Sequence, residues 1–278
     1  MDALIVRTMR PDEISIAVDW AAAEGWNPGL ADAACFAAAD PEGFFIGELD
    51  GAPAATVSCV NYGASFAFLG FYIVREDLRG PRLRTAHMER GHRARRPARD
   101  RARWRGGAAA ELPEVRVRAR LCQRPLRRHR RGPGCAAQAG VVALTEVPLA
   151  AVEAYDATVF PAPRTAFLRA WIGSPGHVGC ALVRDGGLAG WGVIRPCRKG
   201  RKIGPLVADD RATAEVVLSA LLASVGGGEI FLDVPGINRD AVALGARPGA
   251  RAGVRDRAHV YRRDPAVAAG AGIRRRQF

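Results

Sequence analysis

The stretch FAFLGFYIVREDLRG, residues 66–80, decides the fold of the chain. Residues 66–74 are an almost continuous apolar run, rich in aromatic and β-branched side chains, which predicts a strand buried on both faces. A charged turn follows, and after it come Arg79 and Gly80. A strand that runs into a basic residue and a glycine usually opens a loop that holds a phosphate with backbone N–H groups at a helix N-terminus. Pro81 interrupts this pattern, because proline has no N–H to donate.

The net charge of +13 over 278 residues is concentrated in two segments. Residues 79–131 contain 19 Arg, no Lys and 4 acidic residues, and residues 245–278 contain 9 Arg and 2 acidic residues. These segments carry +15 and +7, so the rest of the chain has a net charge of −9. The chain is therefore a mildly acidic protein with two arginine-rich segments, in which Arg, Ala, Gly and Pro replace most other residue types.

Outside these segments the same order of elements occurs twice. GELDGAPAATVSCV (Gly47–Val60) parallels ALVRDGGLAGWGVI (Ala181–Ile194), and each contains an Asp-Gly turn between two apolar runs, which predicts a β-hairpin. A repeat of domain length indicates a tandem duplication. The first copy predicts strands at 4–9, 44–49, 54–62 and 66–74 and helices at 11–24 and 30–39. The second predicts strands at 141–144, 178–184, 188–195, 202–207 and 229–234 and helices at 149–156, 165–172, 212–223 and 238–244.

These elements resemble the GNAT acyltransferase superfamily, in particular a bacterial tandem type with an N-terminal GNAT domain and a C-terminal GNAT-like domain. The resemblance implies an α/β (α+β) chain with domains at 1–135 and 141–278, each a mixed, mostly antiparallel sheet flanked by helices. The stretches that carry it are AVDWAAAEGWNPG, DPEGFFIGELDG, FLGFYIVREDLRG, FPAPRTAFLRAWI, GVIRPCRKGRKIGPLVADD and FLDVP.

The resemblance implies an acetyl-CoA-dependent N-acyltransferase that moves an acetyl group to an amine of a small molecule or peptide. In that superfamily the pantetheine arm of acetyl-CoA lies between the fourth and fifth strands, which implies binding by the backbone near Ile73 and Val74. Arg79 and Gly80 match the start of its pyrophosphate loop, [QR]xxGx[GA]. No such loop follows residues 202–209, so the second domain is interpreted as GNAT-like and cofactor-poor.

The turn that contains Glu24, Trp26 and Asn27 has two interpretations. It is placed to face the acceptor substrate, or it is simply the end of a helix with a packed Trp. The general acid and base are not identified by the sequence. We expect no metal site, because the six cysteines are widely spaced without a CxxC pair and four of the five histidines fall in the arginine-rich segments.

The arginine-rich segments have the composition of a GC-rich gene translated out of frame. Back-translation with the frame moved one base forward tests this idea. Met88-Glu89 must then give a Trp, and Trp104-Arg105 must give a Gly. Elsewhere the codons permit RGYGL from residue 81, which completes the loop RGRGYG, then IGLDGVVAQQPNYRKSGF over 100–117 and PVFETARMYTG over 252–262.

We therefore hypothesise that the frame is shifted near codon 81, restored near codons 132–140 and shifted again near codon 245. The transferase would be intact in the parent gene and impaired in this chain. We also expect residues 81–140 and 245–278 to be poorly ordered, with residues 81–135 disrupting the first domain.

Two other functions follow from the sequence. The first is a nucleic-acid-binding protein that uses residues 81–131 as a basic arm, since arginine binds phosphate. That segment has only Trp104 for base stacking and no helical periodicity, so we do not expect a nucleic-acid partner. The second is a non-catalytic GNAT relic. No apolar stretch approaches the roughly 18 residues of a membrane span, and the N-terminus lacks a signal-peptide pattern, so we expect a cytoplasmic protein without a membrane partner.

Overall fold

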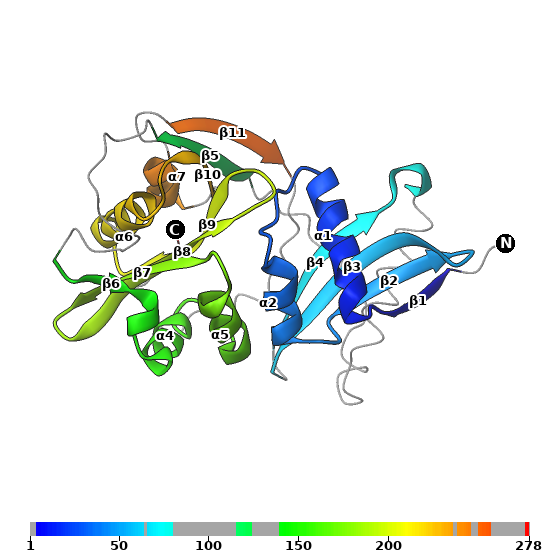
Figure 1. Cartoon of the computed structure of the whole chain (residues 1–278), viewed down its shortest axis with the longest axis horizontal. Coiled ribbons are helices and arrows are strands. Elements are labelled where there is room, and N and C mark those ends of the chain that lie inside the picture. Colours follow the sequence, from blue (N-terminus) through cyan, green and yellow to red (C-terminus); the bar gives the residue numbers. More distant parts are fainter. Residues whose placement is uncertain are drawn as a thin grey trace. The chain divides into compact units, whose positions relative to one another are not determined.

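The computed structural model describes residues 4–63, 66–79, 115–123, 139–235, 238–245, 250–256 and 276–277. The chain divides into two units, one of residues 1–28 and 32–111 and the other of residues 29–31 and 112–278. Each unit contains a sheet flanked by helices, so the predicted α/β class is confirmed (Figure 1). The predicted domain bounds, 1–135 and 141–278, stay a prediction.

The first unit is a four-stranded antiparallel sheet in the order β1-β2-β3-β4. Its Asp50-Gly51 turn has φ values of +52° and +74°, which suit the tight turn that joins two twisted strands. The elements are β1 (Ile5–Thr8), α1 (Ile14–Ala23), α2 (Asp32–Ala39), β2 (Phe44–Leu49), β3 (Ala52–Tyr62) and β4 (Phe66–Val74), with 3-10 turns at Pro11–Glu13 and Glu76–Leu78.

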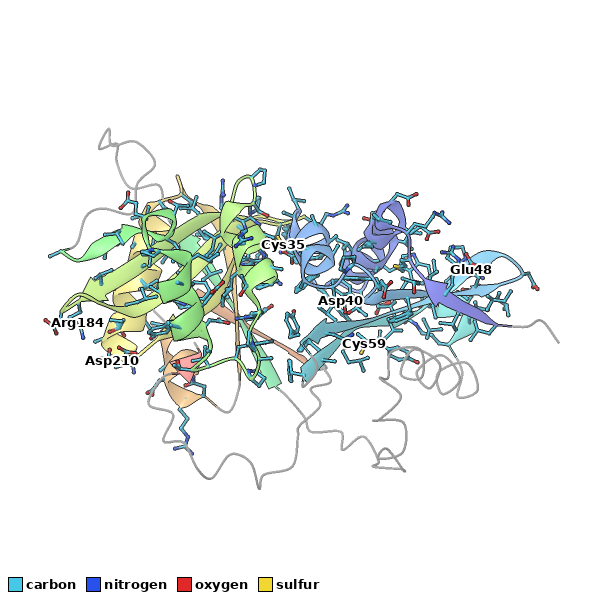
Figure 2. All side chains as sticks on the ribbon, turned by 90° about the horizontal axis from the view of Figure 1, so that it is seen from below. Cys35, Asp40, Glu48, Cys59, Arg184 and Asp210 are labelled. Carbon is cyan, nitrogen blue, oxygen red and sulfur yellow. The ribbon has the colours of Figure 1, made fainter. Side chains whose placement is uncertain are left out.

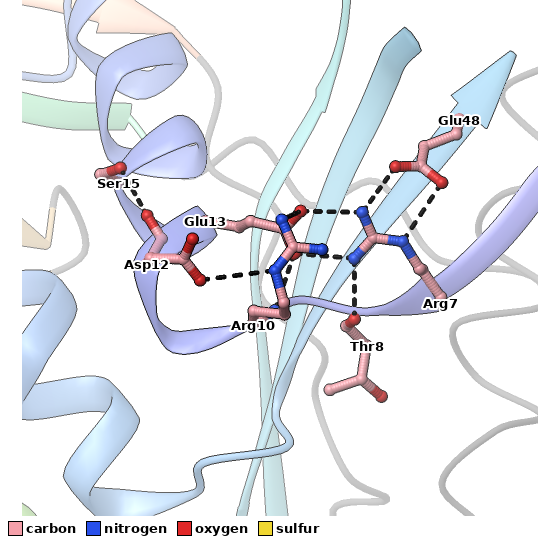
Figure 3. A network of polar contacts seen from close by, with 7 residues as sticks. All are labelled: Arg7, Thr8, Arg10, Asp12, Glu13, Ser15 and Glu48. Carbon is pink, nitrogen blue, oxygen red and sulfur yellow. Dashed lines mark hydrogen bonds and ion pairs between the residues drawn. The ribbon is translucent and has the colours of Figure 1, made fainter. Parts of the chain in front are cut away.

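A network of charged side chains ties β1 to β2 and to the start of α1 (Figure 3). Arg7 on β1 donates to Glu48 on β2 at 2.6 Å and to Glu13 at 2.7 Å. Glu13 also accepts the backbone N–H of Arg10 at 2.8 Å. The hydrogen bonds from Arg7, and then that from the Arg10 backbone, lower the pKa of Glu13 to about 2. The carboxylate of Glu13 is therefore charged, and it holds the helix start against the sheet.

The strands of the second unit that the structure describes form one sheet in the order β11-β5-β10-β9-β8-β7-β6, with β12 paired to β9. Its elements are β5 (Val115–Gln123), β6 (Val141–Ala143), α4 (Leu149–Asp156), α5 (Thr165–Gly173), β7 (Val178–Arg184), β8 (Gly187–Pro196), β9 (Arg201–Ala208), α6 (Arg211–Ala223), β10 (Gly228–Pro235), α7 (Arg239–Gly245), β11 (Ala250–Asp256) and β12 (Arg276–Gln277), with a 3-10 turn at Leu144–Glu146.

The two faces of the second sheet have different contacts. Ile194 on β8 and Ile203 on β9 join the buried core that α6 and α7 complete. Arg195, next along β8, instead lies over the ring of Trp171 on α5, at 4.5 Å from its centroid. Successive residues of a strand point to opposite faces, so α5 packs on the face opposite α6. Asp210 begins α6, because its side chain accepts the Thr213 N–H at 2.7 Å.

The predicted strand at 66–74 is confirmed as β4, but its predicted burial on both faces is wrong. Only Ile73 and Val74 are buried, and Phe68 is 39% exposed. In the part of the chain that the structure describes, β4 pairs with β3 and with no strand on its other edge. An edge strand has a neighbour on one side only, so its apolar side chains keep contact with solvent.

The arginine-rich segments that we expected to be poorly ordered contribute three strands to the second unit. β5 pairs antiparallel with β10 and with β11, and β12 pairs with residues 207–208 of β9. The sequence of β5, VRVRARLCQ, alternates apolar residues with arginine. That period of two is a strand signal, which the emphasis on composition overlooked. Residues 80–114, 124–138, 246–249 and 257–275 lie outside the described residues.

Three of the described cysteines are free thiols, and a fourth is not. Cys35 on α2 and Cys59 on β3 are buried in the first unit (Figure 2), and Cys197 is buried in the second. Cys180 is disulfide-bonded. Asp40 is buried after α2 and accepts the backbone N–H of Asn61 at 2.8 Å, which joins the helix end to β3. None of the described helices has the length and apolar character that a membrane crossing requires.

Candidate functional site

The end of α1 places two of the predicted substrate residues. Gly25 has a φ of +75°, a left-handed conformation that favours glycine. The N–H of Gly25 donates to the carbonyl of Ala22, and the N–H of Trp26 to that of Ala21, both at 2.9 Å. This pair of bonds is the Schellman motif that ends a helix. Glu24 comes directly before Gly25, at the end of the helix, and Trp26 directly after it.

Arg79 joins this turn to the end of β4. Its Nε donates to the carbonyl of Val74 at 3.0 Å, and its Nη2 donates to Oε1 of Glu24. The Arg79 side chain is 46% exposed and the Glu24 side chain 34% exposed, so this ion pair faces solvent and contributes little to stability. Its consequence is positional, because it fixes a guanidinium and a carboxylate at the open edge of β4.

The backbone of Val74 points to that open edge. The N–H of Arg75 donates to the carbonyl of Ala54 at 2.9 Å, so Ala54 and Arg75 form a hydrogen-bonded pair of the antiparallel ladder. The adjacent pair, Ala55 and Val74, is then a non-hydrogen-bonded pair, whose N–H and carbonyl groups point away from the partner strand. The hydrogen bond from Arg79 to the Val74 carbonyl agrees with this geometry. The Val74 N–H points to the same side, away from β3.

A β-bulge distorts β4 just before this point. Phe71 and Tyr72 together oppose Val57 on β3, where the register shifts. Phe71 has a φ of +46°, and its carbonyl accepts the hydroxyl of Thr56 at 2.9 Å. Bulges re-aim the side chains beside them. Here the Phe71 ring turns toward Trp26, with 6.3 Å between the ring centroids.

The structure brings most of the predicted site residues of the first unit together. Val74, Arg79 and Glu24 are linked by hydrogen bonds, and Trp26 reaches the bulge through Phe71. The other three predicted site residues each have a different environment. Ile73 pairs with Thr56 inside the ladder, Asn27 is buried with a φ of +52°, and Gly80 lies outside the described residues.

Sequence reasoning missed the contact between Glu24 and Arg79 and the role of Thr56. Glu24 and Arg79 are 55 positions apart, and no local pattern indicates that they meet. The bulge also has no composition signal, because Phe71 is neither Gly nor Asn, the residues that most often adopt a positive φ. The two adjacent charges, Glu76 and Asp77, are exposed. Asp77 accepts Arg75 at 2.7 Å, which lowers the pKa of its carboxyl.

The second unit has a bulge at the same place in its sheet. Gly204 and Pro205 on β9 together oppose Val193 on β8. The carbonyl of Gly204 accepts Nε1 of Trp171 at 3.2 Å and Nη1 of Arg195 at 3.3 Å. Both units therefore satisfy a bulge carbonyl with a side chain.

Two strands diverge beside this second bulge. β9 and β10 are parallel partners over residues 201–203 and 230–232 only. β8 occupies one edge of β9 along its length. β12, which pairs with residues 207–208, therefore lies on the other edge of β9, the edge that β10 pairs with over residues 201–203. Residues 276–277 thus take a position in the second unit that no described residue takes in the first.

A buried ion pair lies where the gap begins. Nζ of Lys202 donates to Oδ2 of Asp233 at 3.0 Å, and Lys202 is 8% exposed. Burial lowers the pKa of the Lys202 ammonium, and the carboxylate of Asp233 opposes that effect. The pair is a structural link between β9 and β10, because each charge would be costly to bury alone.

A groove of about 400 Å³ lies away from these residues, lined by residues 144–149 together with Arg169, Ile172 and Gly173 of α5. None of the predicted site residues lines it, and Glu146 and Arg169 are the charged residues of its lining, so we assign it no chemistry. Within the described side chains no group of three His, Cys, Asp or Glu is placed to hold a metal ion.

Comparison with known proteins identifies the class. Residues 152–265 match the family profile described as an acetyltransferase (GNAT) domain. The holothin acyltransferase of Pseudoalteromonas sp. (strain SANK 73390) is 29% identical over 234 residues, which cover 81% of this chain and 76% of that protein.

Solved structures show the same fold. A presumed acetyltransferase from Pyrococcus horikoshii superposes with a TM-score of 0.61 at 19% identity, over 94% of this chain and 91% of that one. A tandem GNAT protein from the clavulanic acid biosynthesis pathway superposes with a TM-score of 0.51 at 16% identity, over 91% of this chain and 97% of that one. The two units thus have the fold of tandem GNAT-like domains. Residues 152–265 thus match a GNAT acetyltransferase domain, and the chain is similar to an acyltransferase over 81% of its length.

Proposed function

We propose that the protein is an acetyl-CoA-dependent N-acyltransferase that acetylates an amine of a small molecule or peptide. One observation carries the proposal. Arg79 joins the carbonyl of Val74 to the carboxylate of Glu24 beside an open strand edge. The GNAT domain match and the relative named as a holothin acyltransferase support acyl transfer. A cytoplasmic location stays a prediction.

Acetyl-CoA fits the described residues in two respects. The outward N–H of Val74 is a donor for an amide carbonyl of the pantetheine arm, as expected where a ligand lies along a strand edge. The guanidinium of Arg79, close to the same edge, suits a phosphate group. Gly80, which would continue this site, lies outside the described residues. Pro81 removes one backbone donor from the loop, so we propose that pyrophosphate binding and activity are impaired in this chain.

When bound, acetyl-CoA supplies an acyl group activated as a thioester. The protein then has to hold the amine beside it and accept the proton that the amine loses. We propose that Glu24 attracts the acceptor amine, because its carboxylate lies at the rim of the turn and within reach of the Val74 edge through Arg79. Trp26, 41% exposed, and Asn27 belong to the same turn and would contact the rest of the acceptor.

The other two functions have less support. The nucleic-acid arm of residues 81–131 lies outside the described residues except for β5, and β5 is paired on both edges. The comparisons favour an acyltransferase over both.

The proposal is tested by acetyl-CoA binding in a calorimeter and by release of free CoA thiol in the presence of an amine panel that includes holothin. Val74→Pro removes the outward N–H without breaking the ladder to β3, so it should weaken acetyl-CoA binding by about tenfold or more. Val74→Ala keeps the N–H and is the matched control. Equal affinity of the two variants, or no binding by the unsubstituted chain at millimolar acetyl-CoA, would contradict the proposal.

A further inference from the structure

The indole of Trp26 is a large apolar group that the first unit keeps at its surface. Trp26 follows the turn that ends α1, and 41% of the residue is exposed. Its ring contacts Phe71 on β4, with 6.3 Å between the centroids and an angle of 43° between the planes. The indole therefore packs on the protein with one part and faces solvent with another. A single exposed apolar residue is common, so what matters is how firmly this ring is held and what lies beside it.

Phe71 is the support on which Trp26 packs. The Phe71 ring also contacts Phe36 on α2 and Phe44 on β2, at 6.2 and 5.9 Å between centroids. Phe44 is 1% exposed, so this aromatic cluster reaches the core of the first unit. The φ of +46° at Phe71 is unfavourable for a bulky residue, and the hydroxyl of Thr56 stabilises it by donating to the Phe71 carbonyl at 2.9 Å. The cluster thus holds the indole from below, as a preorganised binding surface requires.

The charged groups beside this turn balance each other. Glu24 is the only acidic residue of residues 24–27, and its Oε1 accepts Nη2 of Arg79. The pair adds no net charge to the surface around Trp26. A ligand with several ammonium groups, such as a polyamine or an amino sugar, is bound best by several carboxylates. A ligand with one amine on an apolar body fits these residues better.

The residue types beside Trp26 also bear on the state of the amine. An alkylammonium has to lose a proton to a base before its nitrogen can attack a carbonyl. Residues 24–27 and 73–79 contain no His, Lys, Cys or Tyr, the side chains that serve most often as such a base besides the carboxylates. An amine attached to an aromatic ring is a weak base and is uncharged at neutral pH. Its nitrogen keeps its lone pair without that first proton transfer.

We propose that the acceptor of the first unit is an amine carried by a flat aromatic ring system that stacks on the exposed part of Trp26. This inference rests on the proposed function and names its substrate class. In the transfer, the amine nitrogen bonds to the carbonyl carbon of the acetyl thioester, and the bond from that carbon to sulfur breaks. The proton that the nitrogen loses passes to the departing sulfur, so the products are an N-aryl acetamide and free CoA thiol.

The test measures acceptor binding to the full chain in a calorimeter at pH 7.5, without acetyl-CoA. The probes are 6-aminoquinoline, which is a flat aromatic amine, cyclohexylamine, which is saturated, and spermidine, which has several ammonium groups. 6-Aminoquinoline should bind about tenfold more tightly than each of the others, because only a flat ring stacks on an indole. Its affinity should change by less than about twofold between 50 and 500 mM salt, because it is uncharged. Equal affinities, or a steep loss of 6-aminoquinoline binding with salt, would overturn the proposal.

Two variants assign the effect to Trp26. Trp26→Leu keeps an apolar side chain but has no ring, so it should weaken 6-aminoquinoline binding by about tenfold. Trp26→Phe keeps a flat ring and should stay within about threefold of the unsubstituted chain. Hydrogen exchange over residues 44–49 and 66–74 shows that the first unit is folded in each variant. Equal affinity of the two folded variants for 6-aminoquinoline would contradict the proposal.

These measurements fail separately from the proposed function. Binding of 6-aminoquinoline through Trp26 without acetyl transfer to it, or to any amine of the panel, would contradict the transferase and leave aromatic recognition by Trp26 standing. Release of CoA thiol with spermidine but not with 6-aminoquinoline would support the transferase and overturn the aromatic acceptor.

Discussion

β4 and β9 hold the same place in their two sheets, but among the strands that the structure describes only β9 has neighbours on both sides. β9 is flanked by β8 on one edge and by β10 and β12 on the other. β4 is paired by β3 alone among the described residues. The burial matches the pairing: Ile203, Leu206, Val207 and Ala208 are at most 2% exposed, whereas most of β4 is only half-buried. Similar apolar sequences therefore reach different environments because the segments that come after them in the chain differ.

The largest expected difference between the two strands is in the cost of removing an aliphatic side chain. Ile203→Ala empties a site in the core beneath α6 and should lower the free energy of unfolding of the second unit by about 3 kcal/mol. Leu69→Ala removes a half-buried side chain that packs beside Phe45 and Cys59, and should cost about 1 kcal/mol. Urea titrations followed by hydrogen exchange in peptides of each unit separate the two values. Equal losses for these two variants would show that β4 is as well covered as β9, and the comparison would fail.

The sequence predicted the individual helices and strands well, but it did not predict which segments lie beside the edge strands of each sheet. The Asp-Gly turns, the Pro11 helix start and the bounds of β4 follow from rules that act within a few residues. The exposure of β4 goes with its pairing to β3 alone among the described residues, which no pattern within residues 66–74 indicates. The contact of Glu24 with Arg79 depends on how α1 and β4 pack, and nothing within either segment encodes it. The strand β5 was hidden by its arginines, although its alternation was there to be counted.

The dependence of stability on pH below 4.5 should also distinguish the two units. Glu13 has its pKa lowered from 4.5 to about 2 by Arg7 and the Arg10 backbone. A carboxyl with a lowered pKa stabilises the fold fully above pH 4.5, and the contribution is lost as pH falls toward 2. Glu13→Gln should therefore lower the stability of the first unit at pH 7 by about 1–2 kcal/mol, below the full linkage value because Arg7 is 32% exposed.

The difference in free energy of unfolding between Glu13→Gln and the unsubstituted chain should vanish as pH is lowered from 4.5 to 2. Hydrogen exchange in peptides of the first unit measures this difference. Asp12→Asn is the matched control, since the Asp12 side chain is 76% exposed and its carboxylate lies 3.5 Å from Nε of Arg10. A gap that stays constant with pH would show that Glu13 acts through packing and not through its charge. Peptides of the second unit should be unaffected by either variant.

The smallest expected effect concerns the Asp-Gly hairpin turn, which has the same backbone conformation in the two units. Asp50 and Asp185 both have a φ of +52°, and the glycines that follow have φ values of +74° and +73°. A left-handed conformation costs an Ala about 1 kcal/mol, while Asp tolerates it better through its short polar side chain. Asp50→Ala and Asp185→Ala should thus each destabilise their own unit by about 1 kcal/mol, and Asp→Gly at either site should be close to neutral. Losses that differ between the two hairpins by more than about 0.5 kcal/mol would mean that the turns are not energetic equivalents. Matching losses would place the difference between the units after the fourth strand, at the point where the arginine-rich segment begins.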